Sequence, residues 1–332
     1  MIGRNAALAL CLAVLASAAG LSAQTLTLRI AANVPANSPW DLGLKRLAAD
    51  FDRVSAGRVR IAFPQSAHVS SESDIIQKMR LGLDGALLST YGLAELYPDS
   101  LALSLPGFIR DDAEFAAVLA EVGPLFESKL CDRYVLLAVS KGGWVRYFSK
   151  TPIVYPSDLA DLRISIDLGN EKVIRLLESL RARTTQGTMA DFLLQVNSNT
   201  VDATLESPIY IASLWSQLRG KLAYMSSFKV APFIGALVFN KSSWDKVPAE
   251  LQPKLEQVVR DMAIKIGLDS EKLEADAIAS LDGIKSPPET ADAGAKWAQA
   301  IAERRNGLIA RMFSADILDA MDVALAKARK SM

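Results

Sequence analysis

The chain has 332 residues, with 37 basic side chains, 37 acidic side chains and one histidine, so its formal net charge is zero. Half of the residues are hydrophobic and 22% are charged, which is typical of a globular protein with a large core. The length is sufficient for two domains. The charge balance argues against nucleic acid as a partner, because that role calls for a basic surface.

Residues 1–23 have the pattern of a secretory signal peptide. Arg4 precedes an apolar run over residues 6–19, and Leu21-Ser22-Ala23 fits a cleavage site before Gln24. The run is shorter than the ~20 residues that a membrane-spanning helix needs. We therefore expect export to the periplasm. Removal of the segment takes Cys11 away and leaves Cys131, which we expect to be a buried small hydrophobe outside any internal disulfide.

Hydrophobic periodicity predicts strands alternating with helices, which is the unit of a parallel sheet. In chain order the expected strands are 26–30, 58–63, 84–89, 134–140, 144–148, 162–166, a strand around 201, 222–225 and 233–239. The expected helices are 39–56, 71–82, 170–181, 189–196, one from about 208, 248–281 and two segments between 291 and 328.

The arrangement predicts two α/β lobes. The chain crosses between them at the glycine pair 142–143 and again near 230, and a helix over 248–281 is about 50 Å long at 1.5 Å per residue, enough to span both lobes. The expected division has four parts: a signal peptide, lobe I, lobe II, and C-terminal helices packed on the lobes. Their ranges are 1–23, then 24–143 plus about 231–268, then 144–230 plus about 269–290, and finally 291–332. Two hinged lobes enclose a cleft, which is a preferred ligand site.

Signals for catalysis or a cofactor are weak. His68 lies in a serine-rich stretch, and no nucleophile-elbow sequence accompanies it. The sequence has no cluster of histidine and cysteine residues spaced as metal ligands, no phosphate-binding P-loop motif and no glycine-rich turn of the dinucleotide-binding type. We therefore expect no cofactor, no metal and no enzymatic activity, although a catalytic carboxylate pair stays open as an alternative.

Several segments in this order and spacing resemble the substrate-binding subunits of tripartite ATP-independent periplasmic (TRAP) transporters over residues 26–260. The segments include "SPW" at 38–40, "MRLGLDGALLS" at 79–89, "GWVRYFSKTPIVYPSDLADLRI" at 143–164 and "TVDATLESP" at 200–208. The resemblance implies a two-lobe periplasmic binding protein fold, type II-like, with a long helix bridging both domains. It also implies a small organic ligand, delivery to the TRAP membrane permease subunits, and an ion gradient as the driving force. We expect a monomer.

The resemblance also implies where the ligand binds. In that family an arginine on the strand after "PSDL" pairs bidentately with the ligand's carboxylate, and Ser165 falls on its position. Arg163 falls on a lysine position and is a candidate substitute for the missing arginine. Arg146 matches a second family arginine and is expected to be a cation facing the ligand.

Other matched positions carry smaller, neutral or apolar side chains. Ser89 falls where acid-sugar binders have a glutamate, Ser207 falls on an asparagine, and Met189 falls near an aromatic residue that packs over the ligand. Together with aromatic residues expected near the cleft, the candidate ligand-binding residues are Asn33, Trp40, Ser89, Trp144, Arg146, Ser165, Met189, Ser207 and Phe233.

These replacements favour a ligand that is more apolar or neutral than is usual in the family, because a buried carboxylate without a bidentate partner costs several kcal/mol. The alternative ligand is an ordinary small carboxylate held through Arg146 and water. Three other classes of protein remain open: a binding protein for an ATP-driven importer or a sensor, a periplasmic carrier of hydrophobic ligands or lipids, and a secreted enzyme on the same scaffold.

Overall fold

The computed structural model describes residues 25–34, 37–64, 71–167, 171–187 and 189–330. The expected signal peptide, Cys11 and His68 lie outside these residues.

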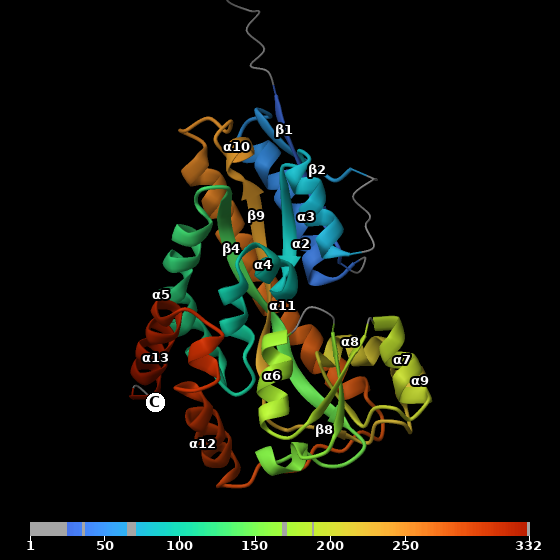
Figure 1. Cartoon of the computed structure of the whole chain (residues 1–332). Coiled ribbons are helices and arrows are strands. Elements are labelled where there is room, and N and C mark those ends of the chain that lie inside the picture. The colour runs from blue at the N-terminus through green and yellow to red at the C-terminus, as the bar shows by residue number, and fades with distance from the viewer. Residues whose placement is uncertain (1–24, 35–36, 65–70, 168–170, 188, 331–332) are drawn as a thin grey trace, which may run out of the picture.

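The strands of the described residues form one nine-stranded sheet that runs through the molecule (Figure 1). Its order is β2-β1-β3-β9-β4-β7-β5-β6, and β8 pairs with β4. The strands are β1 (Leu26–Ala32), β2 (Val59–Ala62), β3 (Gly85–Ser89), β4 (Tyr134–Ser149), β5 (Arg163–Asp167), β6 (Arg183–Gly187), β7 (Ala203–Glu206), β8 (Tyr224–Met225) and β9 (Ala231–Asn240).

The helices cover both faces of this sheet. Those of the first half are α2 (Pro39–Val54), α3 (Glu72–Arg80), α4 (Thr90–Leu96), the 3-10 helix η2 (Pro98–Ser104), α5 (Asp112–Leu130) and the 3-10 helix η3 (Pro156–Leu159). The remainder are α6 (Glu171–Ser179), α7 (Met189–Asn197), α8 (Pro208–Ser213), α9 (Trp215–Leu218), α10 (Lys241–Trp244), α11 (Gln252–Ser280), α12 (Ala293–Arg305), η4 (Ile309–Arg311) and α13 (Ala315–Lys330).

Two long antiparallel strands join the lobes. The parallel group β2-β1-β3 belongs to lobe I, and β7-β5-β6 belongs to lobe II, where β5 runs parallel to both neighbours. Strands β9 and β4 lie between the two groups and pair antiparallel with each other. The expected strands 134–140 and 144–148 are one strand, β4, whose register against β9 shifts between Lys141 and Trp144. Gly143 supplies a φ of 116° at this shift, so the glycine pair bends the strand without ending it.

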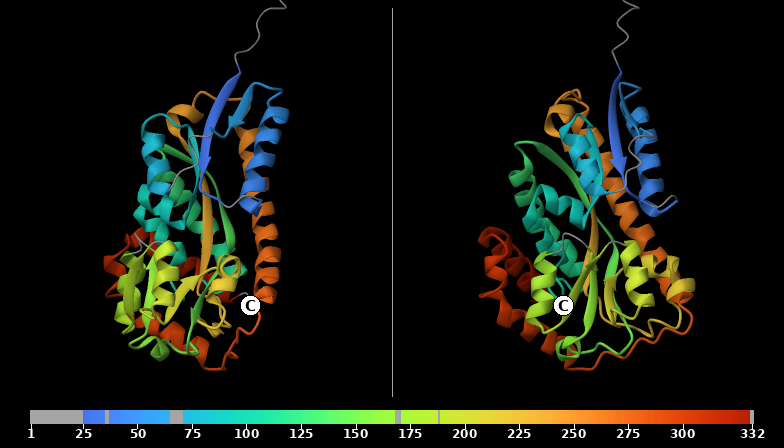
Figure 2. Two further views of the ribbon diagram at one scale, coloured as in Figure 1. Left: turned by 90° about the vertical axis from the view of Figure 1, so that its right-hand side faces the viewer. Right: turned by 45° about the vertical axis from the view of Figure 1, so that its right-hand side comes forward.

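Helix α11 bridges the lobes, as the sequence predicts. It has 29 residues, or about 44 Å at 1.5 Å per residue. It packs against α2 of lobe I, β4, and α8 of lobe II, and it runs along one side of the molecule in the left view of Figure 2.

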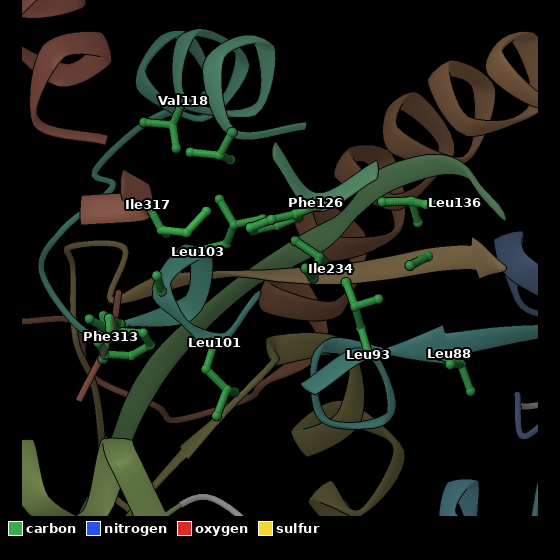
Figure 3. Close-up of a cluster of buried hydrophobic side chains, with 14 of the residues drawn as sticks. Leu88, Leu93, Leu101, Leu103, Val118, Phe126, Leu136, Ile234, Phe313 and Ile317 are labelled. Carbon is green, nitrogen blue, oxygen red and sulfur yellow. The ribbon is translucent and has the colours of Figure 1, made fainter. Parts of the chain in front are cut away.

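Each lobe has hydrophobic side chains packed on both faces of the sheet. In lobe I, one cluster joins η2, α5 and α13 to β3 and β9 (Figure 3), and another joins α2 and α11 to the opposite face. In lobe II, the α6 side and the α7 side have separate clusters. The lobes are thus three-layered units that share one sheet.

The C-terminal helices are tied to both lobes. Arg329 of α13 donates from Nε to the fully buried Glu114 carboxylate of α5, 2.8 Å away, and Arg110 donates to the same carboxylate. Trp297 of α12 stacks on Tyr147 of β4, with ring centroids 6.1 Å apart. The expected burial of Cys131 is wrong, although the residue is a free cysteine as predicted. It follows the last turn of α5 at the surface, where its thiol donates to the carbonyl of Ser128.

Candidate ligand site

A small pocket lies where elements of lobe I, lobe II and the crossing strands meet. Lobe I contributes the start of α4 and the end of η2, the crossing strands contribute Val145 and residues 231–233, and lobe II contributes β5, α6 and β7. The cavity volume is about 30 Å³, room for one or two water molecules at ~10–15 Å³ each. The lobes must therefore move apart before an organic molecule can enter this interlobe pocket.

The lining of the interlobe pocket carries no charged side chain among the described residues. Its apolar and aromatic members are Tyr91, Pro106, Val145, Ile166, Val173, Leu205, Ala231, Pro232 and Phe233. The two hydroxyl side chains, Thr90 and Ser104, are engaged by the protein. Ser104 donates to the carbonyl of Pro232 at 3.1 Å, and Thr90 accepts from the backbone N–H of Ile234 at 3.2 Å.

Two predicted aromatic residues meet at the crossing of β4 and β9. A Cβ at Gly142 would come within 2.9 Å of the Trp40 ring and 3.0 Å of the Phe233 ring. The Trp40 ring also covers Gly235 so closely that no Cβ fits there. Phe233 is half-buried and lines the interlobe pocket, whereas Trp40 lies in the core behind it.

Ser89 caps α4, and its hydroxyl donates to a carboxylate. The Glu72 carboxylate accepts from the backbone N–H and the Oγ of Ser89, each at 2.6 Å, and from the N–H of Gly92 at 3.0 Å. Burial raises the pKa of Glu72, which the hydrogen bonds from Ser89 and Gly92 partly oppose. Ser89 replaces the glutamate of acid-sugar binders, but the Glu72 carboxylate lies directly beside it.

Arg146 is held by protein groups. Its Nη1 donates to the carbonyls of Ser226 and Ser227 at 3.0 and 2.5 Å, and its Nε lies 3.8 Å from a Glu274 carboxylate oxygen. Glu274 of α11 also accepts from the backbone N–H of Trp144 at 2.9 Å. Burial lowers the pKa of Arg146 and raises that of Glu274, and their mutual attraction opposes both shifts. Arg146 is not among the residues that line the interlobe pocket.

Ser165 faces α7. The residue is 4% exposed, and its Oγ donates to the side-chain oxygen of Gln195 at 2.7 Å. Because side chains alternate along a strand, Ile164 and Ile166 lie on the other face of β5, and Ile166 lines the interlobe pocket. The Ser165 hydroxyl therefore lies on the α7 side of the strand, and its part in ligand binding stays a prediction.

Arg163 also has a partner within lobe II. Its Nε and Nη2 donate to the two Asp202 carboxylate oxygens at 2.8 and 2.7 Å. Chiefly through the hydrogen bond from Arg163, the pKa of Asp202 is lowered to about 2. The Arg163 guanidinium, the candidate substitute for the missing family arginine, is therefore paired with Asp202.

The other predicted residues are dispersed. Asn33 is exposed just after β1, and Ser207 caps α8 by accepting from the N–H of Tyr210. Trp144 is buried in the lobe I core, with the ammonium groups of Lys141 and Lys229 over its ring. Met189 begins α7, and its side chain lies outside the described part of the chain.

Residues 30–314 match the family of bacterial extracellular solute-binding proteins, family 7 (DctP). The chain belongs to this family, the solute-binding proteins of TRAP transporters. Family 7 proteins are periplasmic binding proteins. Within the described residues, no helix is both long and apolar enough to cross a membrane.

Solved structures share the two-lobe fold. A TRAP periplasmic solute-binding protein from Ochrobactrum anthropi, with its C-terminus bound in the ligand-binding pocket, is 18% identical with a TM-score of 0.82, covering 94% of this chain and 98% of that one. A protein from Desulfovibrio salexigens with bound orotic acid is 14% identical with a TM-score of 0.78, covering 93% and 100%. One from Sulfurospirillum deleyianum with bound succinate is 17% identical with a TM-score of 0.75, covering 91% and 99%.

In this family 7 protein, sequence reasoning missed Ile166, which lines the interlobe pocket, and two acidic partners of predicted site residues, Glu72 beside Ser89 and Glu274 beside Arg146. Ile166 could have been suspected from the sequence, because it alternates with Ser165 along a strand and its side chain must lie either in the core or at a pocket. Glu72 gives a weaker signal, as an acidic residue in the first turn of a helix. Glu274 gives none, because it is one of many charged residues along α11 and only the fold brings it to Arg146.

Proposed function

We propose that this protein captures a small, largely apolar organic molecule between its lobes and delivers it to a TRAP permease driven by an ion gradient. The observation that carries the proposal is the uncharged lining of the interlobe pocket. Burying apolar ligand surface there stabilises the complex by ~25 cal/mol per Å². A carboxylate on the same wall has no cation to meet, and its desolvation costs several kcal/mol.

Hinge motion is the mechanism that the geometry supports. We assign lobe I to 24–143 plus about 231–268, lobe II to 144–230 plus about 269–290, and residues 291–332 to C-terminal helices packed on both. The chain bends at Gly143 and returns near Ala231, so the lobes can separate about these strands. Ligand that contacts both lobes favours the closed state, since only that state offers both sets of contacts.

Three further parts of the proposal rest on family membership. The protein is exported through a signal peptide over residues 1–23, acts in the periplasm without catalysis, and releases its ligand to membrane permease subunits. Relatives with bound succinate and orotic acid make organic acids the reference ligands for any test. The proposed ligand differs from them in having more apolar surface for each charged group.

The test begins with the ligand that accompanies the purified protein. Native mass spectrometry followed by denaturing extraction identifies it, and we expect a molecule with an apolar body and at most one charge. A tightly bound dicarboxylate such as succinate contradicts the proposed ligand class and leaves the transport role intact. Failure of any ligand to stabilise the closed state contradicts the role itself.

A matched pair of variants locates the site. Ile166→Ala enlarges the interlobe pocket, and Ile164→Ala removes the same atoms from the same face of β5 but is not among the pocket residues. Both lose stability by about 2–4 kcal/mol, the cost of such a buried truncation. We expect only Ile166→Ala to change ligand affinity, by about tenfold, which isothermal titration calorimetry measures. Equal effects of the two variants on affinity place the ligand elsewhere.

A further inference from the structure

One lysine of lobe II is bound by groups of lobe I. Lys172 lies in the first turn of α6, and its Nζ donates to the carbonyl of Pro98 at 3.0 Å and to the Asp99 carboxylate at 3.1 Å. Both acceptors belong to η2 of lobe I. The ammonium group also lies 4.0 Å from the centroid of the Phe313 ring. A carbonyl, a carboxylate and an aromatic face therefore hold one cation across the interface between the lobes.

The lobe I side of this contact is fixed by its own packing. The second Asp99 oxygen accepts from the backbone N–H of Ser314 at 3.1 Å, which ties η2 to the segment that leads into α13. Phe313 is buried and belongs to the hydrophobic cluster that includes η2 (Figure 3). The side chains of Lys172 and Asp99 are 19% and 17% exposed, so water screens their attraction less than that of a surface pair.

The contact lies beside the wall of the interlobe pocket. Val173, the next residue of α6, lines that pocket, and so does Ser104 at the other end of η2. The pocket volume is about 30 Å³, whereas sites for small organic ligands measure ~300–1,000 Å³. The walls must separate to admit such a ligand. Separation of α6 from η2 also breaks the contacts of Lys172, because its acceptors belong to the opposite wall.

A second ion pair near the interface lies at the hinge itself. Lys229 donates to Asp112 at 3.0 Å, but Lys229 belongs to the crossing segment that leads into β9, about which we expect the lobes to move. The pair of Lys172 and Asp99 instead joins a helix of lobe II to a helix of lobe I. Rotation of one lobe against the other therefore changes the distance between Lys172 and Asp99 directly.

We propose that Lys172 is an interlobe latch, which holds the lobes closed over the empty interlobe pocket and limits the entry of ligand. The inference rests on the capture mechanism proposed above and adds a contact that regulates it. A protein that binds only when open has an apparent affinity reduced by the fraction of molecules that are open. Contacts of the ligand with both lobes then replace the contacts that Lys172 loses.

The experiment measures how fast a small molecule reaches the empty pocket. Ala231 lines the pocket and is 3% exposed, so Ala231→Cys places a thiol inside it, with Cys11 and Cys131 replaced by serine. Iodoacetamide is larger than the one or two water molecules that the pocket accommodates, so it alkylates this thiol only when the lobes separate. The ligand-free protein is prepared by unfolding, dialysis and refolding.

Lys172→Met removes the ammonium group and keeps an unbranched side chain. The matched control is Arg175→Met, because Arg175 is an exposed cation of the same helix whose side chain makes no ion pair within the described part of the chain. We expect Lys172→Met to accelerate alkylation of Ala231→Cys at least about fivefold, and Arg175→Met to change it less than about twofold. Asp99→Asn should accelerate it too, and the double variant should match Lys172→Met within about twofold, because both substitutions remove the same interaction.

A second thiol separates opening of the lobes from unfolding. Val196→Cys lies in the buried cluster on the α7 side of lobe II, away from the interlobe pocket. We expect Lys172→Met to change its alkylation less than about twofold. X-ray scattering of ligand-free Lys172→Met without an added cysteine is an independent measurement, and we expect its radius of gyration to exceed that of wild type.

Equal alkylation of Ala231→Cys with and without Lys172→Met rejects the latch, and so does an unchanged radius of gyration. An acceleration that is as large in Arg175→Met, or as large at Val196→Cys, also rejects it. These results leave the capture of a ligand between the lobes standing. If Ala231→Cys is alkylated no faster than Val196→Cys in every variant, the lobes do not open, and this contradicts the proposed capture together with the latch.

Discussion

The ring of Trp40 covers the backbone of Gly235 and leaves no space for a side chain at that position. Trp40 belongs to α2 of lobe I, and Gly235 lies in β9, the strand that leads to Phe233 and the interlobe pocket. The contact therefore sets the distance between helix α2 and the sheet next to the candidate ligand site. A glycine at 235 is what permits the tryptophan to lie there.

Gly235→Ala is expected to displace Trp40 and lower the free energy of unfolding by about 1–3 kcal/mol, the cost of overpacking a core. Urea unfolding followed by tryptophan fluorescence measures both effects. The control is Gly123→Ala, where nothing lies within 4 Å of the new Cβ inside α5. We expect this control to gain about 0.5–1 kcal/mol from helix propensity. Equal stability of Gly235→Ala and wild type contradicts the packing.

Ser165 and Gln195 form a pair that a double-mutant cycle can isolate. Ser165→Ala and Gln195→Ala each remove one side of the 2.7 Å hydrogen bond. We expect a coupling energy of about 1 kcal/mol in urea unfolding. A coupling near zero shows that the Ser165 hydroxyl is directed elsewhere, where it is free to contact a ligand.

Ser165→Arg tests whether residue 165 faces α7, as in the structure, or the ligand, as the resemblance to the family implies. The side chain is 4% exposed and packed against α7, so we expect the guanidinium to destabilise lobe II and to add no affinity for carboxylates. Thermal unfolding and calorimetric titration with succinate report the two effects. A stable variant with increased succinate affinity refutes the observed orientation of β5.

The Arg163–Asp202 pair predicts a specific dependence of stability on pH. The folded-state pKa of Asp202 is about 2, below its usual 3.8, so the ionised form is favoured by folding. The contribution is present above pH 3.8 and is lost as the pH falls towards 2. Because the arginine is 40% exposed, we discount the shift for solvent screening and expect Asp202→Asn to cost only about 1 kcal/mol near neutral pH.

The measurement is the urea midpoint of wild type and Asp202→Asn at neutral pH and near pH 3. The difference in unfolding free energy should shrink at the lower pH. Asp161→Asn is the control, because Asp161 pairs with Arg183 at a site where both side chains are more than 60% exposed, and such pairs contribute little. A difference that stays constant with pH argues against the ion pair.

Arg329 is expected to attach the last helix to lobe I through Glu114. Arg329→Met leaves the fully buried Glu114 carboxylate with Arg110 as its remaining cationic partner. We expect a loss of about 2 kcal/mol, less than for a fully buried pair because Arg329 is itself 38% exposed. Lys330→Met, at the next exposed position, should change stability by less than about 0.5 kcal/mol. Similar losses in both variants exclude the specific contact.

Much of the fold follows from local patterns in the sequence. The alternation of Leu26, Leu28 and Ile30 gives β1, Ser38 and Pro39 begin α2, and the long polar–apolar repeat gives α11. The crossing of the two lobes is also predictable, because a glycine pair interrupts apolar strands. The union of 134–149 into one strand is not, since it depends on pairing with β9 almost a hundred residues later.

The candidate site is less predictable than the fold. Alternation along β5 separates Ser165 from Ile166, but the sequence does not say which face meets lobe I. Arg146 and Arg163 carry the same charge and lie on successive strands of the chain, β4 and β5. Their partners, Glu274 and Asp202, nevertheless come from 128 and 39 residues further along the chain. Contacts of this range are fixed by tertiary packing, which a residue pattern in one segment does not encode.

The position of β9 in the sheet has a consequence for synthesis. Lobe I contains the first strands of the chain, yet its sheet is continued by β9, which is inserted between β3 and β4 and ends only at Asn240. A nascent polypeptide of the first 150 residues can pair β1, β2 and β3 but leaves the hydrogen-bonding edges of β3 and β4 open. The growing chain therefore stays incompletely folded until most of it has left the ribosome, a condition suited to threading through a narrow translocation channel.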